Sequence, residues 1–159
     1  MTQAISKPNN PQDEQNNLYA SDLNLWLEQT IAQLQGGDFH NLDTKNLIEE
    51  LLGLSGRDRR ELESRLDSLL EHLLKRCYVN LPDCHRGWVV TIMHQRSELR
   101  KILKQSPSLK RVFAEAFEES FLTALSIVKV EYTQTNFPDT WQFSRDIDVL
   151  LKADFWEIS

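Results

Sequence analysis

The polar pair with the clearest capacity for chemistry lies in the segment of residues 88–103. The apolar residues of this segment recur at helical spacing, as Trp88, Ile92, Leu99 and Ile102. The middle of this stripe, where another turn of apolar residues would complete it, holds Gln95 and Arg96. An amide and a guanidinium therefore occupy positions at which core residues are expected.

Polar residues of two earlier segments have similar positions. His72 and Lys75 flank an apolar stripe, and Glu49 and Glu50 lie beside another. If the helices pack as a bundle, these side chains converge on one partly buried polar cluster, a candidate ligand-binding or catalytic site made of Glu49, Glu50, His72, Lys75, Gln95 and Arg96. The alternative is that each side chain extends past the core to solvent.

Burial of Arg96 would require a partner, because an isolated guanidinium is too costly to leave unpaired in a protein interior. We expect a carboxylate to pair with it, from Glu49 or Glu50, with His72 close by.

Other catalytic patterns are absent from the sequence. Cys77, Cys84 and His85 have a C-x6-C-H spacing that matches no usual zinc site, and no histidine follows a glutamate by three residues as in di-iron bundles. The sequence has no Gly-x-Ser-x-Gly motif, and the glycines of residues 52–56 lack the lysine of a phosphate-binding loop. We therefore expect no metal, no cofactor and, on balance, no enzyme.

Basic residues are concentrated in the middle of an acidic chain. The net charge is −6, whereas residues 54–105 carry 11 Lys and Arg against 7 Asp and Glu. Arg57, Arg59, Arg60 and Arg65 alternate with acidic residues, which favours a salt-bridged exposed face over a nucleic-acid surface. We expect this charge to be matched within the domain or between copies, and expect no nucleic-acid binding.

These residues must be positioned by helices. Asp22 and Asp43 are good N-caps, Gly36 and Gly37 end the first helix, and Gly53 and Gly56 should interrupt or bend the second. Apolar spacing predicts further helices over residues 62–77 and 88–103, after Ser106-Pro107, and near Ile147–Leu151 with Ser144 as cap. The sequence predicts an all-α, single-domain bundle of five to six helices over residues 18–159, after a flexible tail of residues 1–17.

The last 23 residues contain five aromatic residues, a density that predicts a C-terminal segment docked on the bundle. No apolar run approaches the roughly 18 residues of a membrane helix, and two cysteines without a leader are typical of free thiols. We therefore expect a cytoplasmic protein that does not enter a membrane.

Taken together, a set of short motifs resembles the bacterial family called domain of unknown function 29. The similarity covers roughly residues 18–156 and departs from the family pattern at Gly53 and Cys77. The resemblance implies an all-helical cytoplasmic fold and carries over no catalytic residue. The motifs are Leu25-Trp26, Asn46-Leu47-Ile48-Glu49-Glu50, Glu63-Ser64-Arg65-Leu66, His72-Leu73-Leu74-Lys75, Trp88, Gln95-Arg96, Ser106-Pro107-Ser108-Leu109, Phe137-Pro138 and Asp154-Phe155-Trp156.

These observations favour a non-enzymatic helical module for protein interaction or regulation, through a protein partner or self-association. Two alternatives stay open. One is an enzyme or small-ligand binder that uses Glu49, His72 and Arg96, and the other is a nucleic-acid-linked regulator that uses the surface from Arg57 to Arg65.

Overall fold

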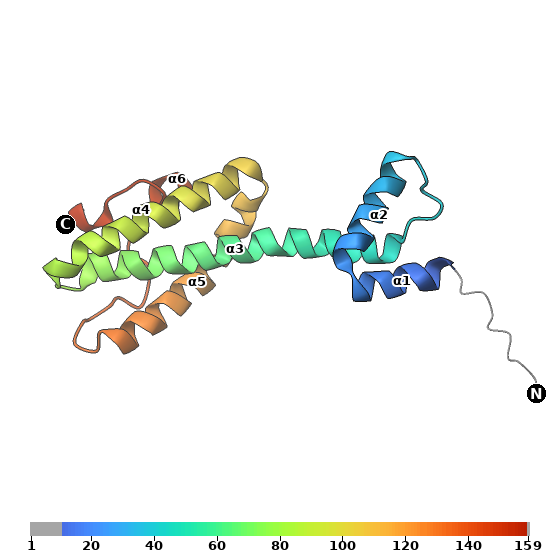
Figure 1. Ribbon diagram of the computed structural model, residues 1–159. Coiled ribbons are helices and arrows are strands. Elements are labelled where there is room, and N and C mark those ends of the chain that lie inside the picture. The colour runs from blue at the N-terminus through green and yellow to red at the C-terminus, as the bar shows by residue number, and fades with distance from the viewer. Residues whose placement is uncertain (1–10, 159) are drawn as a thin grey trace, which may run out of the picture. The chain divides into compact units, whose positions relative to one another are not determined.

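The computed structural model describes residues 11–158, which form helices and no strand (Figure 1). The chain divides into two compact units, Met1–Ser55 and Gly56–Ser159, called here the first and second units. The expectation of a single domain over residues 18–159 stays a prediction. The helices are α1 (Pro11–Ser21), α2 (Leu23–Gln35), α3 (Thr44–Tyr78), α4 (Pro82–Gln105), α5 (Leu109–Glu131), α6 (Ile147–Leu150) and a 3-10 turn, Phe155–Glu157.

Local capping chemistry sets the helix ends of the first unit, as predicted. The Asp22 carboxylate accepts a hydrogen bond from the Leu25 amide at the start of α2, and Asp43 accepts one from the Asn46 amide at the start of α3. At the end of α2, Gly37 has a positive φ of 72°, which glycine adopts without strain.

The predicted tail is wrong in part. Residues 1–10 lie outside the described residues, whereas residues 11–17 belong to α1. Pro11 suits the first turn of a helix. The carboxylates of Asp13 and Glu14 stabilise that turn, because the N-terminal end of a helix carries a partial positive charge. The helix also packs on its neighbour, because the Tyr19 ring meets the Trp26 ring edge-on, with centroids 4.9 Å apart.

The predicted interruption at Gly53 and Gly56 is also wrong, because α3 continues through both residues, whereas the alternative, a bend there, stays a prediction. A glycine inside a helix costs about 1 kcal/mol relative to alanine. Strong helix formers on both sides, leucine, arginine and glutamate, offset that cost.

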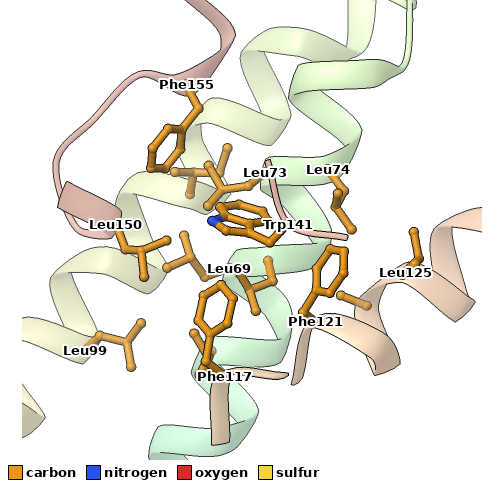
Figure 2. Close-up of a cluster of buried hydrophobic side chains, with 14 of the residues drawn as sticks. Leu69, Leu73, Leu74, Leu99, Phe117, Phe121, Leu125, Trp141, Leu150 and Phe155 are labelled. Atoms are coloured by element: carbon orange, nitrogen blue, oxygen red, sulfur yellow. The ribbon is translucent and has the colours of Figure 1, made fainter. Parts of the chain in front are cut away.

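The core of the second unit is built on the leucines of α3. Their spacing of three and four residues forms one buried stripe, covered by leucines of α4 and phenylalanines of α5. Figure 2 shows the Trp141 indole among these side chains, which come from several elements of the unit. The fully buried members from α3 are Leu62, Leu66, Leu69, Leu70, Leu73 and Leu74.

The C-terminal segment is docked on this core, as the aromatic residues predicted. The Trp141 ring lies 5.6 Å from Phe117 and 5.8 Å from Phe155 between centroids, in edge-on geometry. Its indole N–H donates to the Ser144 carbonyl at 3.1 Å, so its polar group is satisfied.

Two predicted caps of the second unit are displaced by two residues. Asp146, not Ser144, caps α6 by accepting a hydrogen bond from the Val149 amide. Ser106 is the C-cap of α4, and Ser108, not Ser106, is the residue before α5, which begins at Leu109. Pro107 lies in the turn between the two helices. Several Ser and Asp residues near each boundary can cap a helix, so spacing alone does not select among them.

Docking of the C-terminal segment predicts the effect of Trp141→Ala. Removing this buried ring from a packed aromatic cluster should lower the free energy of unfolding by about 3 to 5 kcal/mol. The more exposed Val149→Ala in the same segment should cost less than about 1 kcal/mol. Urea denaturation of the full chain measures both, and an unchanged midpoint for Trp141→Ala would reject docking.

Candidate functional site

Arg96 is buried at the centre of α4 and is satisfied mainly by backbone. The residue retains 4% exposure. Its Nε donates to the Leu150 carbonyl at 2.9 Å and its Nη2 donates to the Ala153 carbonyl at 2.6 Å. Burial lowers the pKa of Arg96, and the Asp154 carboxylate opposes that shift from 3.9 Å.

This geometry explains the polar break in the α4 stripe. The carbonyls at the end of α6 have no partner within that helix, and a guanidinium carries several N–H donors in one plane. Arg100 contributes a further hydrogen bond, to the Leu151 carbonyl. The expected burial of Arg96 is confirmed. Within the second unit the nearby acid is Asp154, and backbone carbonyls are the closer partners, whereas the expected pairing with Glu49 or Glu50 of the first unit stays a prediction.

Lys75 is the second buried cation of the described chain. Its Nζ lies 2.8 Å from a Glu71 oxygen and 2.9 Å from a Glu131 oxygen, which ties α3 to the end of α5. Burial acts to lower the pKa of Lys75, but hydrogen bonds to both glutamates outweigh it and raise that pKa. The ammonium is therefore held charged by its own unit.

The remaining predicted site residues make separate contacts. His72 Nδ1 lies 2.8 Å from the Ser68 carbonyl on the same helix, and Gln95 accepts a hydrogen bond from Arg65. Within the described second unit, no hydrogen bond or ion pair joins any two of His72, Lys75, Gln95 and Arg96. Their role in ligand binding or catalysis stays a prediction.

Glu49 and Glu50 lie in the first unit. Glu49 is exposed, and Glu50 accepts a hydrogen bond of 2.7 Å from the Tyr19 hydroxyl. That hydrogen bond raises the pKa of Tyr19. Glu50 therefore connects α3 to α1.

Two further features of the second unit bear on a metal or catalytic site, its cysteines and a groove lined by acidic residues. Cys77 and Cys84 are free, and burial raises the pKa of Cys77 to about 11, so its thiol stays protonated near neutral pH. A groove of about 270 Å³ between α3 and α5 is lined by acids such as Glu63 and Glu119. Within residues 11–158, no three His, Cys, Asp or Glu side chains gather in a way that could hold a metal ion.

The first unit has a polar centre. Trp26, 1% exposed, donates its indole N–H to Asp43 Oδ2 at 3.2 Å. Asn46 donates to the same Asp43 oxygen at 2.7 Å and to Asn16 Oδ1 at 2.9 Å. Buried Thr30 follows Trp26 by one helical turn. In the described residues of this unit, Trp26 is the only large apolar side chain that is buried.

Most of the other large apolar side chains of the first unit are exposed, whereas Leu18, Leu27, Leu42 and Leu47 are half-buried. On α2 the exposed residues follow a stripe beside the buried Trp26–Thr30 face, and on α3 they recur at spacings of three and four. We call the exposed members of these two faces, Leu23, Ile31 and Leu34 on α2 with Ile48, Leu51 and Leu52 on α3, the apolar stripes. Counting three neighbours as well, nine large apolar residues are at least 40% exposed: Leu23, Leu25, Ile31, Leu34, Phe39, Ile48, Leu51, Leu52 and Leu54.

This surface was not predicted from the sequence. Periodicity identifies an apolar face but not what covers it. A usable signal was present: Thr30 and Asn46 lie one turn from Trp26 and Glu50, so each helix has a second, more polar face able to pack inward.

The net charge of the protein resides in the same unit. The first 55 residues contain eight acidic residues and two lysines, a net charge of −6, whereas residues 56–159 contain 16 of each sign.

None of the helices in residues 11–158 combines the length and hydropathy that a membrane span requires.

Comparison with known proteins gives one match. The family model described as "Domain of unknown function DUF29" matches residues 18–156. No curated protein and no solved structure matches the chain.

The backbone partners of Arg96 predict the effects of three substitutions. Arg96→Met should lower the free energy of unfolding by about 2 to 4 kcal/mol, because buried carbonyls lose charged donors. Asp154→Asn should cost less than about 1 kcal/mol, since that carboxylate is half exposed and distant. Exposed Lys104→Met on the same helix is the control, also below about 1 kcal/mol. Equal losses for Arg96→Met and Asp154→Asn in urea denaturation would contradict the carbonyl-anchoring account.

Proposed function

The chain belongs to the family Domain of unknown function DUF29, and we propose that it is a non-enzymatic protein-interaction module whose binding surface is the apolar stripes of the first unit. The observation that carries the proposal is the imbalance of burial in that unit. One large apolar side chain is buried there, and nine are at least 40% exposed.

The energetics of burial support a covered surface. Full burial of one large apolar side chain is worth about 1.5 to 3 kcal/mol. The first unit leaves most of that stabilisation unused, and exposed apolar surface arranged in stripes is typical of binding sites. A partner that covers the stripes would supply the missing core.

The polar residues of the second unit support the non-enzymatic part of the proposal. Arg96 is engaged by backbone carbonyls and Lys75 by two glutamates, so both cations serve the packing of their own unit. A ligand site is expected instead to have polar groups that converge on a pocket. As part of the proposal, we place the protein and its partner in the cytoplasm.

A photo-crosslinking residue at exposed position 52 tests the proposal in the protein's own cells. We expect a discrete adduct with another polypeptide, because a partner would lie against this face of α3. The same crosslinker at exposed Lys110 on α5 should give none.

Two triple variants decide whether the adduct depends on the stripes. Ile48→Gln, Leu51→Gln and Leu52→Gln together, with the crosslinker moved to position 34, should abolish the adduct while the fold is retained, because glutamine is a good helix former. Leu122→Gln, Ile127→Gln and Val130→Gln together remove equally exposed side chains from α5 and should leave the adduct unchanged. An adduct that survives the first variant, or no adduct at all, would refute the proposed function.

A further inference from the structure

We infer that the occupant of the apolar stripes is a basic amphipathic helix of another protein. This inference rests on the proposed function and adds the chemistry of the partner. Three observations carry it: the acids of the first unit have no ion pair within residues 11–158, several lie beside the stripes, and their charge disfavours a second copy.

The described acids of the first unit form no ion pair within residues 11–158. Every ion pair of the described chain joins residues of the second unit. The first unit has eight carboxylates, and its single described cation is Lys45. Asp43 is buried and Glu50 is half-buried, which leaves six exposed acids that a cationic partner could meet: Asp13, Glu14, Asp22, Glu28, Asp38 and Glu49.

Exposed acids flank the apolar stripes on both helices. Glu28 precedes Ile31 by three residues, which places the two on neighbouring positions of the α2 surface. Glu49 follows Ile48 directly at the edge of the α3 stripe, and Asp22 precedes Leu23. An apolar surface with an acidic rim matches a helix that has one apolar face and lysines or arginines at its borders.

The same charge disfavours a second copy on this surface. A two-fold contact through the stripes would bring two units of charge −6 together. Their acidic rims would approach within the screening length of about 8 Å at physiological salt, where like charges repel. The same acidic rims would attract the lysines or arginines of a basic segment.

The length of the stripes fits a helix of a few turns. α2 has 13 residues, so a partner helix of matching length extends over about 20 Å. Apolar residues at spacings of three and four along such a helix can pack against the stripes, which is the way an amphipathic helix presents its apolar face to a partner.

Two designed peptides test the inference with the full chain. One repeats leucine and lysine in a helical pattern over about four turns, and the other has glutamate in place of every lysine. Fluorescence anisotropy should show binding of the lysine peptide at least about 30-fold tighter than the glutamate peptide, and a loss of about tenfold or more between about 50 and 300 mM salt.

Matched variants separate a specific site from general attraction to an acidic protein. Glu28→Gln with Glu49→Gln should weaken the lysine peptide several-fold. Glu115→Gln with Glu119→Gln removes the same charge from α5 and should have little effect. The stripe variant Ile48→Gln, Leu51→Gln, Leu52→Gln should weaken the peptide about tenfold or more.

Each other result overturns a defined part of the account. Equal binding of both peptides, lost in the stripe variant, would leave the stripes as a binding surface and overturn the basic partner. A dimer in sedimentation that the stripe variant dissociates, with neither peptide bound, would make a second copy the occupant. Equal weakening by both pairs of glutamine substitutions would mean non-specific attraction and overturn the inference. The crosslinking experiment at position 52 tests the proposed function separately.

Discussion

The Asp43 carboxylate is the constraint on which the first unit depends. One oxygen accepts from the Asn46 amide and so starts α3, and the other accepts from the Trp26 indole and the Asn46 side chain. Asn46 also reaches Asn16 on α1, so three helices are joined through one capping acid. Because polar groups make these connections, the inward faces of α2 and α3 need few apolar residues. Most of the large apolar residues on these two faces are left exposed.

The second unit is organised in the opposite way. Its α3 leucines and the aromatic residues around Trp141 supply a large apolar core, and its buried cations join backbone and acids of the same unit. A long helix therefore passes from a unit held mainly by hydrogen bonds to one held mainly by apolar burial. Hydrogen bonds contribute about 1 kcal/mol each on net, less than a fully buried leucine. The first unit thus has more to gain from a partner.

Much of the fold could be predicted from the sequence, because caps and apolar periodicity are local properties. Asp22, Asp43 and the glycines after α2 act as their chemistry predicts, and the aromatic C-terminal segment docks. The burial of Arg96 could be inferred from a gap in a stripe, but its partners could not, since backbone carbonyls carry no residue signature. The outward direction of the apolar stripes had one signal, the second and more polar face of each helix, but which face of a helix is covered depends on its neighbours in space.

Amide hydrogen exchange along α3 tests most directly the claim that the first unit is under-packed. Residues 62–74 should exchange only through global unfolding, because their leucines form the core. Residues 48–55 of the same helix should exchange through local opening, with protection factors lower by about 100-fold or more. That gradient within one continuous helix is the predicted result. Equal protection of the two segments in the isolated protein would contradict the account, because it would mean that the first unit is as tightly packed without a partner as the second.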